Sequence, residues 1–287
     1  KKAWQEGKIY GAARVAASSE DKVYTYIPDL DKVEFDDDAD YVHFTSNNTI
    51  FGTRFTKFPE TKAPLACDMS SDILSREIDV SKFGVIYAGA QKNLAPAGVT
   101  IVIARRDLIE SPLPVCPTML KWKMQANDGS LYNTPPCFSI YMANLVLRHL
   151  KKQGGVKAIN EINVYKAGLL YDFIDNSSFY TNNVVKEYRS IMNVPFVTPS
   201  KAGRKVRQRG ESERACHPQG TQAGGRHARF HLQRNARGRR EKTCGIHEEI
   251  RTGKRVRRRT WLKFLNSTRS AKWRRKNFPQ AILFLRT

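Results

Sequence analysis

Three short runs of apolar residues, each followed by polar or charged side chains, constrain the fold more than any other feature. They are 63–68 (APLACD), 83–88 (FGVIYA) and 99–104 (VTIVIA). Each has the length of a strand, and apolar and polar residues do not alternate along it, which is typical of strands in a sheet covered on both faces. A shorter run, 41–44 (YVHF), predicts a further strand.

Helical patterns follow the third run. Apolar residues spaced three or four apart predict a helix over 138–152, which Gly154-Gly155 ends. A second helical pattern covers 164–176 and is broken by Asn176-Ser177-Ser178. Strands that alternate with helices in this way predict an α/β fold.

Two chemically active side chains follow neighbouring runs. Asp68 closes the run 63–68, and Lys92 comes shortly after 83–88. In doubly wound sheets ligands bind beyond the carboxyl ends of the strands, so this carboxylate and this amine can face one ligand. They can equally form a partly buried ion pair or lie apart as solvated loop residues, and the residues alone leave these alternatives open.

Charge divides the chain near residue 200. Residues 201–287 hold 26 Lys and Arg against 5 Glu and no Asp, whereas the earlier residues are almost neutral. The net charge of +22, taken over the whole chain, would suggest a nucleic-acid-binding protein. Because the excess is confined to the tail, the two parts are interpreted separately.

Cysteine usage and hydropathy limit the cellular setting. The five cysteines are sparse and have no CxxC spacing, which favours a reducing compartment such as the cytoplasm. The longest apolar run, Gly98–Ala104, is too short to span a membrane, and the polar residues 1–7 do not resemble a signal peptide. The chain lacks an initiator Met, so we expect it to begin within a longer protein.

Three stretches carry a family resemblance: 67–109, which contains the motif AGAQKN, 130–156 (SLYNTPPCFSIYMANLVLRHLKKQGGV) and 171–196. They resemble the phosphoserine aminotransferases of the class V pyridoxal-phosphate-dependent family, from about Lys1 to Pro199. The resemblance implies the aspartate-aminotransferase-like fold of type I pyridoxal-phosphate enzymes. It implies a large coenzyme-binding domain over 1–157, without its start, and a smaller α+β domain that begins at 158.

The resemblance also implies site residues. Lys92 matches the catalytic lysine that bonds to pyridoxal 5'-phosphate, and Asp68 matches the carboxylate that pairs with the pyridine nitrogen. Thr49 and Gln91 match further coenzyme contacts. Asn133-Thr134 match a pair that reaches the coenzyme phosphate of a partner subunit, which implies a homodimer with shared active sites. No metal site is implied.

The implied reaction moves an amino group between O-phospho-L-serine and 2-oxoglutarate, giving 3-phosphohydroxypyruvate and L-glutamate, in L-serine biosynthesis. Another class V aminotransferase or lyase is an alternative. Two departures from the family pattern are Ala95, where Gly is usual, and Asn48, where Glu is usual. The family's phosphate-binding segment would precede Lys1.

The basic tail, 200–287, allows three interpretations. Arginines interleaved with aromatic residues favour a nucleic-acid-binding arm, and the same composition suits a disordered extension. The third is a reading-frame shift: one coding string for 226–237 (RHARFHLQRNAR), displaced by one nucleotide, gives GMRASIYNAMP, which resembles the family at this point. The same displacement restores family-like sequence over 217–225 and 241–250. We therefore expect a frameshifted, disordered tail and no nucleic-acid partner.

Overall fold

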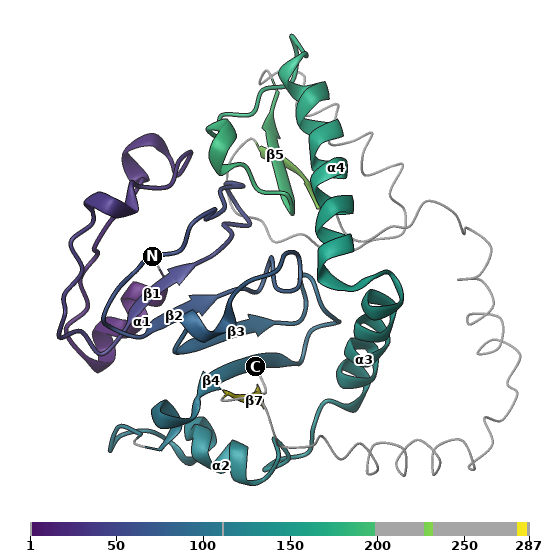
Figure 1. Cartoon of the computed structure of the whole chain (residues 1–287). Coiled ribbons are helices and arrows are strands. Elements are labelled where there is room, and N and C mark those ends of the chain that lie inside the picture. Colours follow the sequence, from purple (N-terminus) through teal and green to yellow (C-terminus); the bar gives the residue numbers. More distant parts are fainter. Residues whose placement is uncertain (1, 111, 199–226, 232–279, 286–287) are drawn as a thin grey trace, which may run out of the picture. The chain divides into compact units, whose positions relative to one another are not determined.

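A mixed five-stranded sheet forms the centre of the computed structural model, which describes residues 2–110, 112–198, 227–231 and 280–285 (Figure 1). All of these residues belong to one compact unit of the chain. The strands lie in the order β1–β2–β3–β4–β7. Their bounds are β1 Val42–Thr45, β2 Leu65–Asp68, β3 Val85–Gly89, β4 Thr100–Arg105 and β7 Gln280–Leu285.

Strand direction changes at β4. The strands β1, β2 and β3 are parallel, β4 is antiparallel to β3, and β7 is antiparallel to β4. A parallel return needs a crossover of a dozen or more residues, and the short connection between Gly89 and Thr100 cannot provide one. The four strands predicted from the apolar runs are confirmed, with ends shifted by one or two residues.

The main core lies on the inner strands of this sheet. Every residue of β2, β3 and β4 is buried or half-buried, which agrees with a sheet covered on both faces. Cys67, Ile86 and Ala88 are almost completely buried, and Phe44 packs with Phe83 at one side of them. These contacts hold the carboxyl ends of β1, β2 and β3 in fixed positions relative to one another.

Four α-helices accompany the strands within the described residues: α1 Lys2–Tyr10, α2 Trp122–Asn127, α3 Cys137–Lys152 and α4 Gly155–Asp175. Short 3-10 helices cover Glu20–Lys22, Leu30–Lys32, Val80–Lys82, Arg106–Ile109, Thr118–Leu120 and Lys186–Tyr188. None of the described helices is long and apolar enough to cross a membrane.

The helix predictions were right for α3 and wrong for the start of α4. The predicted start at 164 is late, because α4 begins at Gly155 and already buries Ile159 and Asn163. Gly154 has φ of +93°, a left-handed conformation that is easy for glycine. The glycine pair therefore turns the chain and lets the next helix begin at once, instead of opening a loop.

A second, smaller core lies between α4 and the strand β5, Asn193–Val197. Ala167, Tyr171 and Ile174 of α4 pack with Val194 and Phe196 of β5. β5 also pairs antiparallel with β6, His227–His231. The sequence pattern predicted neither β6 nor β7; the rest of the basic tail lies outside the described residues.

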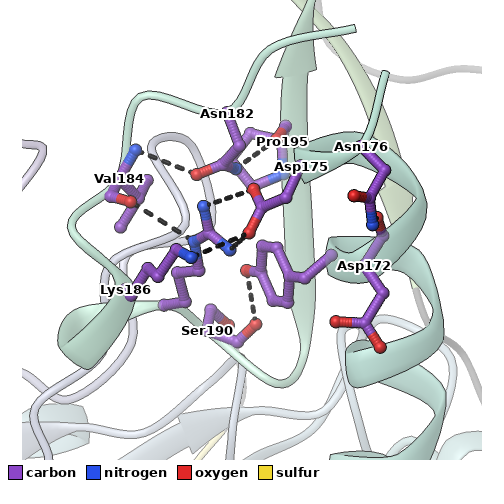
Figure 2. Close-up of polar contacts among 10 residues, drawn as sticks. Asp172, Asp175, Asn176, Asn182, Val184, Lys186, Ser190 and Pro195 are labelled. Carbon is purple, nitrogen blue, oxygen red and sulfur yellow. Dashed lines mark hydrogen bonds and ion pairs between the residues drawn. The ribbon is translucent and has the colours of Figure 1, made fainter.

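Polar contacts close the loop before β5 (Figure 2). Both guanidinium Nη atoms of Arg189 donate to the carboxylate of Asp175 at 2.8 Å, and the guanidinium lies over the ring of Tyr171. The Tyr171 hydroxyl donates to the carbonyl of Ser190 at 2.8 Å. Figure 2 shows Asp175 facing this loop, whereas Asp172 points away from it.

The loop after β1 docks against β5. The Nδ2 of Asn47 donates to the Oδ1 of Asn193 and to the Oγ of Ser71, both at 2.8 Å. Gly52, with φ of +76°, lies so close to Pro195 that a Cβ there would come within 2.3 Å of the proline Cδ. The loop that carries Thr49 is therefore held from both sides.

Candidate functional site

The predicted site residues Thr49, Asp68 and Lys92 follow three adjacent parallel strands. Asp68 is the last residue of β2, Lys92 comes just after β3, and Thr49 comes just after β1. Because β1, β2 and β3 are parallel, these three positions lie at the same carboxyl-terminal end of the sheet. This is the place where open α/β sheets bind ligands.

The amine of Lys92 is held by a hydroxyl. Its Nζ donates to the Oγ1 of Thr49 at 2.9 Å, and the lysine side chain is otherwise exposed. Within the described part of the chain, no ion pair within 4.0 Å joins Lys92 to Asp68. The ion-pair alternative left open by the sequence is therefore not what the structure shows.

Asp68 is oriented by Ser70. Its Oδ1 accepts the backbone N–H of Ser70 at 2.9 Å and the Ser70 hydroxyl at 2.6 Å. The same hydroxyl oxygen accepts the N–H of Gly89 at 3.0 Å, so it ties the end of β2 to the end of β3. No described residue donates a hydrogen bond to the Oδ2 of Asp68, which leaves that oxygen for a ligand.

Gln91 lies against Gly89. A Cβ on Gly89 would come within 2.7 Å of the Gln91 Oε1, so the absence of a side chain at Gly89 allows the amide to occupy this position. The structure therefore places Gln91 beside the turn that carries Lys92.

Asn133 and Thr134 do not join this group. Both are exposed, and the Nδ2 of Asn133 lies 3.3 Å from the Sδ of Met119, which is a weak acceptor. In the described residues, no hydrogen bond connects Asn133 or Thr134 to Thr49, Asp68 or Lys92.

A histidine–tyrosine pair near Asp68 was missed by the sequence reasoning. The Nε2 of His43 on β1 lies 3.0 Å from the hydroxyl of Tyr87 on β3, and Tyr87 is in register with Asp68. Burial lowers the pKa of His43 despite the nearby Asp68 charge, so the imidazole is neutral at pH 7. The only signal in the sequence was the polar imidazole of His43 inside the apolar run 41–44.

A second carboxylate, Asp72, was also missed. It is buried, its Oδ1 accepts the Ser46 hydroxyl, and burial raises its pKa to about 6. Arg76 and Arg54 oppose that rise through their positive charges. The signal in the sequence was the polar segment DMSSD directly after a buried strand.

The group of side chains is suited to an organic ligand more than to a metal. Among the described residues, no cluster of three or more His, Cys, Asp or Glu side chains could hold a metal ion. An amine, a hydroxyl and a carboxylate with one unused oxygen can instead hold a molecule that carries both a carbonyl group and a basic ring nitrogen.

Comparison with known proteins finds several phosphoserine aminotransferases that are similar to this chain. A phosphoserine aminotransferase of Bacillus cereus is 56% identical over 201 residues, which are 70% of this chain and 56% of the relative. The phosphoserine aminotransferase structure from Bacillus circulans subsp. alkalophilus is 46% identical, with a TM-score of 0.71, over 74% of this chain and 59% of that one. The pyridoxal-phosphate-bound enzyme of Trichomonas vaginalis is 36% identical, with a TM-score of 0.69, over 72% and 62%.

These matches settle the fold and the family. The chain spans about half the length of the curated relatives it matches. The predicted aspartate-aminotransferase-like α/β fold is confirmed. The family model described as aminotransferase class-V matches residues 2–210, and the chain therefore belongs to the class-V aminotransferase family.

Proposed function

We propose that this chain carries the coenzyme-binding part of a phosphoserine aminotransferase that uses pyridoxal 5'-phosphate. The amino group would pass between O-phospho-L-serine and 2-oxoglutarate, giving 3-phosphohydroxypyruvate and L-glutamate, in L-serine biosynthesis. The observation that carries the proposal is the placement of Lys92, Asp68 and Thr49 after three parallel strands that end together.

The described residues fit this coenzyme. The Lys92 amine is within reach of solvent, so it is available for a covalent bond to an aldehyde. The unused Oδ2 of Asp68 is a suitable acceptor for a protonated pyridine nitrogen. Thr49 and Gln91 lie beside the lysine and provide further polar contacts. When bound, pyridoxal phosphate supplies an electron-withdrawing ring that accepts the electron pair left when the substrate α-proton departs.

The protein's own part in the reaction is to position groups and move a proton. The Thr49 hydroxyl accepts from the Lys92 Nζ and fixes its direction. Lys92 would carry the proton between the α-carbon of the substrate and the coenzyme. Ser70 keeps Asp68 in one orientation, and the neutral His43 beside it adds no positive charge that would compete for the carboxylate.

The assembly and the domain division belong to the same proposal. Asn133 and Thr134 would contact the coenzyme phosphate of a second subunit in a cytoplasmic homodimer, and their exposure supports this role. The proposed large domain, 1–157, and the small domain beginning at 158 divide the chain inside α4. The separate core that α4 forms with β5 supports a second domain.

We also propose that the tail from residue 200 is frameshifted and that its charge has no role in nucleic-acid binding. The family match ends at residue 210, close to the point where the basic composition begins, and this supports the proposal. Resequencing the gene across codons 195–250 tests it. A verified, uninterrupted frame that encodes the tail as it stands would refute the frameshift.

Kinetics distinguish this reaction from those of other class V enzymes. Purified chain supplied with pyridoxal phosphate and 2-oxoglutarate should form glutamate from phosphoserine at a higher kcat/KM than from alanine or serine. Lys92→Ala should abolish this turnover, and Lys82→Ala, an exposed lysine before β3, should keep it. A preference for alanine or serine would assign the site to another aminotransferase.

A further inference from the structure

The structure contains a polar hollow of about 380 Å³. Its lining comes from the loop after β1, the segment after β2 and the first half of α4. The polar and charged lining residues are Arg54, Thr56, Arg76, Glu77, Lys157 and Asn160. None of them belongs to the set proposed to bind the coenzyme.

Arg54 contributes unused hydrogen-bond donors to this hollow. Its guanidinium makes no hydrogen bond and no ion pair with any described residue, and its Nε is buried without a partner. An arginine carries five donors, and a partly buried one without acceptors is costly unless an outside group supplies them.

Arg76 is fixed in place beside Arg54. Its Nη2 donates to the backbone carbonyl of Phe55 at 2.6 Å, and its guanidinium lies 4.9 Å from the ring centroid of Phe58. Its Nε is also buried and has no hydrogen-bond partner among the described residues. The planar group is therefore held in one orientation while several of its donors remain unused by the described residues.

The charged side chains around the hollow carry an excess of positive charge. Arg54, Arg76 and Lys157 are positive, and Glu77 is the one acidic residue among the described residues of the lining. In the described residues, Glu77 makes no ion pair within 4.0 Å with any of the three. The charge of the buried Asp72 offsets part of the repulsion between the two arginines, but its Oδ1 already accepts the Ser46 hydroxyl.

We propose that this hollow binds a phosphate group, either as inorganic phosphate or as a small phosphate monoester. Two guanidinium groups with donors that no described residue uses, one ammonium, a hydroxyl at Thr56 and an amide at Asn160 match a compact anion with several acceptor oxygens. None of the residues of this hollow is among those proposed to bind the coenzyme, so this proposal does not depend on the proposed function.

Calorimetric titration of the full chain at pH 7 tests the proposal, with inorganic phosphate in one arm and glycerol 3-phosphate in the other. The ligand that binds with the higher affinity identifies the source of the phosphate group. Arg54→Gln should weaken binding about ten-fold, as expected for loss of a charge-assisted hydrogen bond. Lys157→Gln should weaken it about three-fold, since that lysine is exposed, and Glu77→Gln should strengthen it by a similar factor.

Controls separate a built site from general attraction to a basic chain. Lys82→Gln removes one exposed positive charge elsewhere and should leave the affinity unchanged. Circular dichroism of each variant checks that it is folded, and Arg54→Lys should recover part of the affinity. No binding in either arm, or equal weakening by Lys82→Gln and Lys157→Gln, would overturn the proposal.

Discussion

Replacing Asp175 by Asn should destabilise the smaller core by about 2 kcal/mol, the low end of the range for a hydrogen bond between charged groups. The pair with Arg189 has two parallel hydrogen bonds of 2.8 Å, and the Arg189 side chain is only 11% exposed. Asparagine keeps one acceptor and turns a donor toward the second Nη, which leaves a nearly buried positive charge partly unpaired. The low end applies because Asp175 is 30% exposed, so water can reach the site.

Urea denaturation followed by circular dichroism measures this loss. Asp172→Asn is the matched control, because Asp172 lies one turn earlier on α4, is exposed and points away from the loop (Figure 2). It should change the free energy of unfolding by less than about 0.5 kcal/mol.

The effect of Asp175→Asn should also depend on pH. The hydrogen bond from Arg189 holds the pKa of Asp175 below its ordinary value. The stabilisation is therefore complete above about pH 4, the pKa of an unfolded aspartate, and disappears as the pH falls through the folded pKa. Equal stability of Asp175→Asn and Asp172→Asn at pH 7 would refute the proposed contribution of the Arg189–Asp175 pair.

Three other substitutions test the packing and the buried charge. Ile86→Ala should cost roughly 3 kcal/mol by opening a cavity at a residue that is 1% exposed, and a loss below about 1 kcal/mol in the free energy of unfolding, measured by urea denaturation, would contradict this. Gly52→Ala should cost about 2 kcal/mol or more, because its Cβ would collide with Pro195 in a left-handed backbone conformation; thermal unfolding measures it. Burial raises the pKa of Asp72 to about 6, so the folded state holds a proton more tightly than the unfolded state. Stability should then fall by up to about 3 kcal/mol as the pH rises from about 4 to 6, and Asp72→Asn should remove this slope in urea titrations.

Local patterns predicted the parts of the fold that depend on local chemistry. The apolar runs that became β2, β3 and β4 are buried because most of their residues are apolar, so their positions could be read directly. The placement of Asp68 and Lys92 followed, since each comes shortly after such a run. Only the parallel pairing of β2 with β3 was needed to bring them to the same end.

Features that depend on register and long-range pairing could not be predicted. The contact between His43 and Tyr87 arises from two strands on either side of β2, and nothing in either strand alone indicates it. The pair of Arg189 with Asp175 joins a loop to a helix end 14 residues away. β7 pairs with β4 through backbone groups, which any sequence can supply.

The start of α4 could not be predicted from the sequence for a different reason. Gly154-Gly155 correctly indicated the end of α3, but the same glycines also allow the chain to turn and re-enter a helix directly. The residues 155–163 carry fewer apolar positions than the rest of α4, so their helical pattern was weak. Packing of Ile159 and Asn163 into the interior decides the outcome.

The central claim is that Lys92 bonds to the coenzyme while Asp68 holds its ring. Incubation of the chain with pyridoxal phosphate, reduction with borohydride and peptide mass spectrometry test it most directly. We expect one modified lysine, Lys92, with no modification in Lys92→Ala and weaker coenzyme uptake in Asp68→Ala, which keeps Lys92. Modification of other lysines in preference to Lys92, or unchanged uptake in Asp68→Ala, would contradict it.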